Sequence, residues 1–308
     1  MDVSPSKAMF PMALVAISTC LTLPIGSGAV SYATYNGYLE AYGYTDYQFE
    51  FLDMFKGRIL ILFVVLLYAI FIATKIAPSE PPVPIPSAMR DAKQKAGGKE
   101  VKPLDKTHEV LGYGIFILTT LGLIFESKTG IPGWQVTLTG AMLMIVTGVL
   151  TADEAIRALP LRIGLMLVGA LTVGGAMVST GLGDKIGEMI EILVGGSHNG
   201  YVIGALFFIV PWICTQLMNN NSVMAIFQPV IILSCKTLGC DPRGPLILMM
   251  AAALTAYMTP MATGCIPMLM EAGGYDQKSL IKQGWLPALI ICVTAVFSVM
   301  TIFPAYPN

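Results

Sequence analysis

Charge is scarce in this sequence. Asp, Glu, Lys and Arg make up 12% of the 308 residues, whereas soluble proteins carry roughly 25%. Hydrophobic residues make up 55%, and the mean hydropathy is +0.71. So few polar side chains cannot cover a water-exposed surface, which excludes an ordinary soluble domain. We therefore predict a multi-pass integral membrane protein, with the cell membrane as its location.

The sequence also lacks the signatures of several functional classes. Neither a P-loop nor the His-Glu-x-x-His spacing of zinc proteases occurs, so ATP-driven pumping and metal hydrolysis are not expected. No clustered basic face of the kind that binds nucleic acid is present. The cysteines have no paired spacing typical of metal or disulfide scaffolds; they are Cys20, Cys214, Cys235, Cys240, Cys265 and Cys292. We predict no enzyme activity, no transition-metal site and no organic cofactor.

Long uncharged runs are what the sequence does contain. Each is long enough to cross a bilayer about 30 Å thick as a helix; they are residues 8–39, 129–152, 163–183, 244–270 and 283–308. Two further spans, 57–77 and 109–126, carry charges only near their ends, where long side chains can snorkel to the membrane surface. These runs predict an all-α integral membrane fold.

One uncharged run, residues 192–235, is too long for a single span of about 20 residues and carries Asn219, Asn220, Asn221 and Ser222 at its centre. Lipid offers no water to satisfy an amide, so these side chains must face protein, an ion or a ligand. A re-entrant hairpin explains both facts: helices over Tyr201–Met218 and Val223–Cys235 would meet inside the membrane at the polar turn. The bland alternative is that the asparagines only hydrogen-bond helices together, which is more typical of a single Asn than of a cluster.

Two stretches of the sequence are similar at a constant offset of 236 residues. Residues 20–29 align with residues 256–265, so that Pro24 meets Pro260 and Gly28 meets Gly264. Proline removes a backbone donor and glycine admits bends, so we expect each helix to unwind there and expose carbonyls. Interrupted helices at corresponding places in two inverted halves are the best sequence pointer to a transport site.

Loop charges predict the orientation of these segments. The long polar segment from Pro78 to His108 is rich in Lys and Arg, which predicts a flexible cytoplasmic linker. The acidic loop with Glu40, Asp46 and Glu50 then lies outside, so the two broken helices cross the membrane in opposite directions. We therefore expect an inverted repeat.

These polar stretches resemble the divalent-anion:sodium symporters of the ion transporter superfamily, the carriers of dicarboxylates, citrate and sulfate. The residues that carry the resemblance are Thr215 to Pro229, Thr259 to Thr263, Gly273 to Tyr275 and Lys282 to Gly284. The resemblance implies a secondary active transporter that moves a small divalent anion, coupled to sodium or alternatively to protons. It also implies a homodimer and an elevator motion.

The resemblance further implies which residues bind the solutes. It places substrate binding on Asn219, Asn220, Asn221, Ser27, Gly28, Thr263 and Gly264. It places cation binding on Thr215, on Asn220 and on the carbonyls of Ala262 and Gly26. Helix N-termini can bind an anion there without Lys or Arg, and carbonyls freed by unwinding suit a hard cation.

The sequence departs from the family pattern in three ways. The Ser and Thr of the family's Ser-Asn-Thr motif are Asn219 and Asn221, and the Asn that usually follows each unwound Thr is replaced by apolar residues. The identity of the anion is therefore open. The family's first spans and first hairpin would precede Met1, so we expect an upstream segment or a separate chain to supply them. A non-transporting or incomplete carrier subunit is the alternative function.

The sequence also allows an enzyme to be considered as an alternative to the carrier. Gly181 to Asp184 matches the Gly-x-Gly-Asp signature of intramembrane aspartyl proteases, but these need a second Asp in a neighbouring span, and none is present.

We therefore favour the carrier and divide it into four parts. They are the remainder of a first repeat (1–77), the cytoplasmic linker (78–108), scaffold spans with an interfacial helix (109–191), and second-repeat transport elements (192–308).

Overall fold

The computed structural model describes residues 4–24, 27–84, 105–125, 129–158 and 199–306, together with isolated positions between 159 and 198. Within these residues the chain is helical and contains no strand, which confirms the predicted all-α class. The helices long and apolar enough to cross a membrane are Asp53–Ile76, Lys106–Ile124, Asn220–Leu238 and Gln277–Ile302. They agree with a multi-pass membrane protein.

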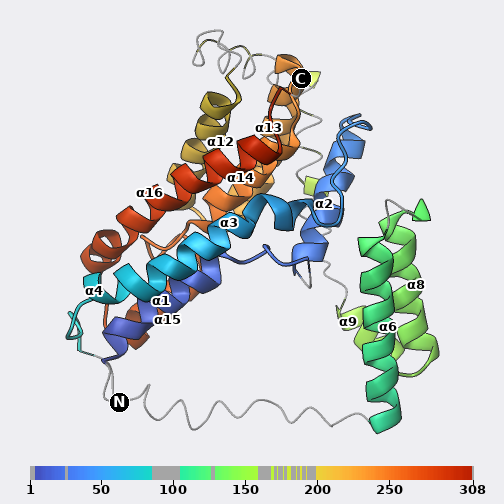
Figure 1. The fold of residues 1–308 in the computed structure, drawn as a ribbon, viewed down its shortest axis with the longest axis horizontal. Helices are drawn as coiled ribbons and strands as arrows, with labels where there is room; N and C mark the ends of the chain where they lie inside the picture. The colour runs from blue at the N-terminus through green and yellow to red at the C-terminus, as the bar shows by residue number, and fades with distance from the viewer. Residues whose placement is uncertain are drawn as a thin grey trace.

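Figure 1 shows the helices coloured in chain order, from blue at the N-terminus to red at the C-terminus. Their bounds are α1 Pro5–Ser18, α2 Ser27–Ala41, α3 Asp53–Tyr68, α4 Thr74–Ile76, α6 Lys106–Ile124, α8 Gly133–Val146, α9 Ala152–Ala158, α12 Gly200–Thr215, α13 Asn220–Leu238, α14 Arg243–Leu254, α15 Cys265–Gly273 and α16 Gln277–Ile302. A π-helical turn, Ala69–Ala73, joins α3 to α4, so the three segments form one span.

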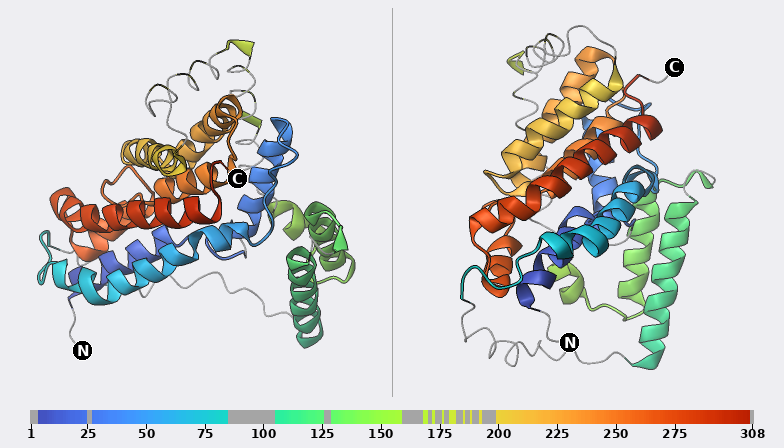
Figure 2. Two further views of the ribbon diagram at one scale, coloured as in Figure 1. Left: turned by 45° about the horizontal axis from the view of Figure 1, so that its top comes forward. Right: turned by 60° about the vertical axis from the view of Figure 1, so that its left-hand side comes forward.

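Helix α14 lies at the centre of the main bundle. Every residue from Gly244 to Leu254 is buried, and α14 contacts α12, α13, α16 and α3. Its sequence carries no charge after Arg243, as expected of a helix surrounded on all sides. Helices α3 and α16 lie side by side along one side of this bundle (Figures 1 and 2).

Helices α6 and α8 form a separate antiparallel pair that stands beside the main bundle in all three views (Figures 1 and 2). Large apolar side chains on this pair remain exposed; Trp134 is 65% and Val146 80% exposed. Lipid would cover such side chains, so their exposure fits a membrane-spanning pair. Helix α8 is shorter than the predicted run 129–152, because a turn at Thr147 and Gly148 ends it.

Helices α12 and α13 form a helix–turn–helix at the place where the sequence predicts two helices and a polar turn. They pack against each other and against α14, and the turn from Gln216 to Asn219 joins them. At its other end α13 stops at Gly239, whose φ of 65° is the left-handed conformation typical of a helix C-terminus. The observed helices start and end within three residues of the predicted bounds.

The structure also confirms that both proline-containing helices are interrupted. The first break separates Ser18 from Ser27, and the second separates Leu254 from Cys265. Each break begins well before its proline, so the Pro and Gly signals locate the unwound segments but not their full length. The carbonyl ends at which α1 and α14 stop are held by side chains of other helices, described below.

Several predictions fall on residues outside the described ones. These are the carbonyl of Gly26, the side chain of Ser27, most of the linker 78–108, Asp184 of the protease signature, and most of the span 163–183 with its interfacial helix.

Candidate functional site

The turn of the α12–α13 hairpin is built by asparagine capping. Asn219 is the N-cap of α13, and its side-chain oxygen accepts a hydrogen bond from the N–H of Asn221 at 3.0 Å. The Asn220 side-chain oxygen accepts from the same N–H at 2.9 Å. Asn is among the preferred N-cap residues because its side chain satisfies a backbone donor that has no partner in the helix. The polar tip thus starts a helix within the uncharged run.

The second unwound segment, residues 255–264, lies directly against this tip. The N–H of Asn220 donates to the carbonyl of Ala262 at 3.2 Å. The Thr259 hydroxyl donates to the carbonyl of Gln216, and the Gln216 side-chain amide donates to the carbonyl of Thr255 at 2.9 Å. These bonds satisfy backbone groups that the unwinding leaves free. They bring the hairpin tip and the break into one polar site.

The C-terminal ends of α12 and α14 provide backbone carbonyls to this site. Helix α12 ends at Thr215, whose hydroxyl donates to the carbonyl of Ala253 at 3.1 Å, one residue before the end of α14. The C-terminal ends of α12 and α14 therefore meet. Their dipoles place negative potential at that point, which favours a cation.

The opposite ends provide N–H groups. Helix α13 begins at Asn220 and α15 begins at Cys265, and the bond from Asn220 to the carbonyl of Ala262 holds these two starts together. The start of α13 is therefore held beside the residues that lead into α15. The N-terminal dipoles of both helices favour an anion. Cation-favouring and anion-favouring helix ends thus lie on the two sides of one turn.

Burial divides the predicted site residues into two groups. Thr215 and Ala262 are completely buried and Thr263 is 9% exposed. Asn219, Asn221 and Gly264 are exposed, and Asn220 lies between these extremes. Two of the predicted cation ligands, Thr215 and Ala262, therefore lie inside the protein, while three of the predicted anion ligands lie on an accessible surface.

Thr263 is fixed by its own segment. Its hydroxyl donates to the carbonyl of Ala256 at 3.0 Å across the break, and the N–H of Ile266 donates to the carbonyl of Thr263 at 3.0 Å. The hydroxyl oxygen keeps lone pairs that can accept from a ligand or bind a cation.

The first break contributes to the site less directly. Helix α2 contacts α13, but among the described residues no hydrogen bond joins Gly28 to the hairpin tip. Gly28 is buried, and a Cβ at this position would collide with the carbonyl oxygen of Leu23. A close backbone approach therefore explains this glycine.

Arg58 is the residue for which the sequence-based prediction was wrong. It lies near the start of the span 57–77, where a snorkelling side chain was expected, yet the guanidinium is completely buried. It donates to the carbonyls of Ser18 at 2.7 Å and Cys20 at 2.8 Å, at the C-terminal end of α1. The side chain reaches the first break instead of the membrane surface because those carbonyls offer better acceptors than lipid.

Sequence reasoning also assigned no role to Gln216 and quoted Thr259 only as part of a family motif. Both hold the hairpin tip against the unwound segment through the bonds described above. Their polarity inside an uncharged run was the available signal. Each lies beside a predicted ligand or proline, so a prediction based on motifs overlooked them.

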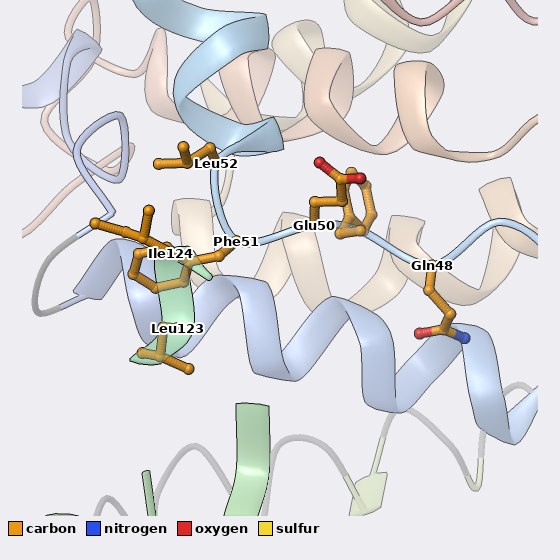
Figure 3. A pocket seen from close by; sticks show the side chains of 7 residues that line it. Gln48, Glu50, Phe51, Leu52, Leu123 and Ile124 are labelled. Atoms are coloured by element: carbon orange, nitrogen blue, oxygen red, sulfur yellow. The ribbon is translucent and has the colours of Figure 1, made fainter. Parts of the chain in front are cut away.

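A pocket that does not belong to this site lies where α6 approaches the loop before α3. Its lining consists of residues 48–52 together with Leu123 and Ile124 (Figure 3). None of the predicted substrate or cation ligands lines it. Within the described residues, no group of three or more His, Cys, Asp or Glu side chains is placed to hold a metal ion.

Comparison with known proteins identifies the family. The profile of the citrate transporter family matches residues 1–253 and, in a second overlapping match, residues 121–307. The chain belongs to this family. Membership agrees with the resemblance to divalent-anion:sodium symporters and confirms the prediction of a membrane transport protein instead of an enzyme.

Three curated relatives, all at low identity to this chain, carry the names of transporters. An uncharacterized transporter of Synechocystis is 23% identical over 68% of this chain and 34% of its own length. Sodium/sulfate cotransporter 2 of Chlamydomonas reinhardtii is 24% identical over 54% of this chain and 19% of its own length. An uncharacterized transporter of Escherichia coli is 20% identical over 67% and 33%, respectively. The chain thus spans about a fifth to a third of these relatives.

Proposed function

We propose that this chain forms the solute-binding part of a secondary transporter that moves a small divalent anion together with a cation. One observation carries the proposal: the C-terminal ends of α12 and α14 and the N-terminal ends of α13 and α15 meet at the hairpin tip. Oppositely signed helix ends next to each other suit a cation and an anion bound as neighbours.

The anion would bind without a basic side chain. Residues 192–235 and 244–270, which supply the hairpin and the second broken helix, contain no Lys or Arg. The N-terminal ends of α13 and α15 contribute positive potential, and the accessible amides of Asn219 and Asn221 add N–H donors. Thr263 and Gly264 would border the same anion, with Ser27 and Gly28 approaching from the first break.

The cation would bind on the buried side of the tip. Thr215 supplies a hydroxyl oxygen, Asn220 an amide oxygen and Ala262 a carbonyl, all of which are hard oxygen ligands. Sodium suits this oxygen set better than a proton does, because none of the three groups ionises near neutral pH. The sodium/sulfate cotransporters among the relatives support the same cation. A cation beside the anion lowers the cost of moving charge through low dielectric.

Two sets of contacts support an inverted repeat. At the start of α1, Ser6 donates to the carbonyl of Gly273 at 2.9 Å, at the end of α15. At the start of α14, Arg243 lies over the ring of Tyr47, in the loop after α2. Each broken helix thus starts beside the end of the other, as two antiparallel copies would. In a bilayer this arrangement would place both breaks and a re-entrant hairpin tip near the midplane.

The separate α6–α8 pair supports the division into scaffold and transport parts. We propose that the region 109–191 is a scaffold and that the hairpin with the broken helices moves against it as an elevator, in a homodimer. The apolar side chains exposed on α6 and α8 would then contact lipid or a second copy.

The substrate class we propose is sulfate or a di- or tricarboxylate such as citrate. The family description names citrate, and the named functions of several relatives include sulfate. Both are compact, multiply charged anions that two helix N-termini and several amides can surround.

Uptake into proteoliposomes tests this proposal. The purified chain would be supplied with an inward sodium gradient and labelled sulfate or citrate, and wild type would be compared with Asn220→Ala and Asn199→Ala. Asn199 is a matched control because it caps α12 at the far end of the same hairpin. We expect about a 100-fold loss or more for Asn220→Ala, comparable to removing an essential binding group, and near wild-type uptake for Asn199→Ala. Unchanged uptake in Asn220→Ala contradicts the proposed site.

A second measurement tests ligand binding by itself, whereas uptake also requires a complete carrier. Sulfate and sodium should raise the melting temperature (Tm) of wild type in detergent, because a ligand that binds only the folded state stabilises it. The rise should be lost in Asn220→Ala. A ligand-dependent rise without uptake would favour the alternative of a carrier subunit that needs a further segment or partner chain. Absence of both would contradict the transport proposal.

A further inference from the structure

Arg58 is a positive charge inside a membrane-spanning helix. It lies on α3, and its side chain is completely buried. The ion pairs among the described residues join Lys56 to Glu50 and Asp53, and Arg243 to Asp241; none includes Arg58. A buried charge without a counterion is costly, and ionisable residues within membrane spans are expected to be functional.

The partners of Arg58 are backbone carbonyls at the first break. Its two terminal nitrogens donate to Ser18, the last residue of α1, and to Cys20, two residues further. The third donor, Nε, has no hydrogen-bond partner within the described part of the chain. The C-terminal end of a helix carries about half a negative charge. Arg58 therefore compensates a helix dipole and not a carboxylate.

The second break also exposes carbonyls at the end of a helix, but different groups donate hydrogen bonds to them. At the offset of 236 residues, Ser18 corresponds to Leu254 and Cys20 to Ala256. There the unwound carbonyls accept hydrogen bonds only from uncharged groups among the described residues, namely the Thr215 and Thr263 hydroxyls and the Gln216 amide. Among the described residues no positively charged side chain bonds the carbonyls at the end of α14, where Thr215, one of the proposed cation ligands, lies.

We propose that Arg58 is a tethered cation that takes the place of a bound ion at the first break. The inference rests on the proposed function, because it presumes that broken-helix carbonyls bind a cation in the second half. Its consequence is stoichiometric: the residues of this chain bind one exchangeable cation, at the second break, while the first break carries its charge permanently. Arg58 is a positioning residue that fixes α1 relative to α3 and sets the charge of the first break.

Arg58→Gln tests this role by removing the charge and leaving space beside the two carbonyls. The 308-residue chain in detergent would be titrated with NaCl against choline chloride at constant ionic strength, with Tm as the readout. The matched control is Lys75→Gln, an exposed charge on the same span. We expect Arg58→Gln to have a lower Tm in choline and to gain an extra sodium-dependent rise of about 3 °C or more. Lys75→Gln should respond to sodium as wild type does.

The same titration distinguishes the proposed role of Arg58 from a purely structural one. A structural role would lower the Tm of Arg58→Gln equally in sodium and choline, and that result overturns the proposal. Arg58→Lys should restore the wild-type sodium response in part, because its ammonium keeps the charge but has a different donor geometry.

Thr215→Val separates this proposal from the proposed function. If Arg58 fills the first break, Thr215→Val alone should remove the sodium response, since no second exchangeable site remains. A residual sodium response in Thr215→Val with Arg58 intact overturns the proposal even if Arg58→Gln does not fold. If wild type itself shows no sodium response, the sodium-coupled function fails, and the gain or absence of a response in Arg58→Gln still decides the role of Arg58.

Discussion

The two broken helices share a backbone design but differ in the groups that hold their open ends. At the first break, the carbonyls of α1 accept hydrogen bonds from the buried guanidinium of Arg58. At the second, the carbonyls of Ala253 and Thr255 accept from the neutral Thr215 and Gln216 of α12 and the turn after it. The carbonyl of Ala256, which corresponds to that of Cys20, accepts from the Thr263 hydroxyl. In the proposed function, the first break therefore carries a fixed positive charge and the second an exchangeable one.

The N-terminal sides of the two breaks differ as well. Gly28 and Gly264 occupy corresponding positions, yet Gly28 is buried against the carbonyl of Leu23, while a Cβ on Gly264 would meet nothing within 4 Å. The first break is therefore tightly packed, and the second is open on the side where the proposed anion would approach.

The largest loss of stability should come from adding a methyl group at Gly28 in the first break. Gly28→Ala places a methyl group against a backbone oxygen that no side-chain rotation can relieve, so we expect destabilisation of about 3 kcal/mol, at the upper end for overpacking. Gly264 has a helical φ of −61° and open space around it, so Gly264→Ala should change stability by less than about 1 kcal/mol. Denaturant unfolding in detergent would measure both variants. Equal costs would contradict the packing difference between the two breaks.

A smaller effect should come from the neutral partner at the second break. Thr215→Val keeps the side-chain shape but removes the hydroxyl that donates to Ala253, so we expect a loss of about 1–2 kcal/mol and loss of the sodium-dependent Tm rise. Thr237→Val is the control, because that hydroxyl bonds a carbonyl of its own helix, that of Leu233. Should Thr237→Val weaken the sodium response as much as Thr215→Val does, the sodium effect does not depend on the second break.

The smallest expected effect is a pH-dependent change in Tm at Asp276, which lies outside both breaks. At the start of α16, the Ser279 hydroxyl and backbone N–H hold the pKa of the Asp276 carboxyl below its usual value. A lowered pKa in the folded state adds stability above the unfolded pKa, which is lost as the pH falls through the folded pKa. Acidification should therefore lower the Tm of wild type slightly more than that of Asp276→Asn, a neutral N-cap. Identical acid profiles would show that this cap makes no pH-dependent contribution.

Part of this architecture was predictable from the sequence for clear physical reasons. Three adjacent asparagines in an uncharged run require partners that lipid cannot provide, so the helix–turn–helix at Thr215 to Asn220 follows from the amide groups themselves. The repeated proline and glycine located both breaks. The resemblance to a symporter family agreed with the family to which the chain belongs.

Other features depend on three-dimensional contacts that no local pattern encodes. Arg58 near a span end looked like a snorkelling charge, because the carbonyls that bind it lie 38 residues or more away in sequence. Gln216 and Thr259 were overlooked because their acceptors belong to different segments. The lengths of the breaks depend on these contacts, so the proline positions alone could not give them.

The central claim is that oppositely signed helix ends at one hairpin tip bind a cation and an anion side by side. The most direct measurement is an anomalous difference map from crystals of the chain grown with sodium and selenate, a heavy analogue of sulfate. We predict a selenium peak between the first turns of α13 and α15, next to Asn219, Asn221 and Thr263. A selenium peak elsewhere, or no peak at saturating selenate together with no citrate-dependent rise in Tm, would contradict the account.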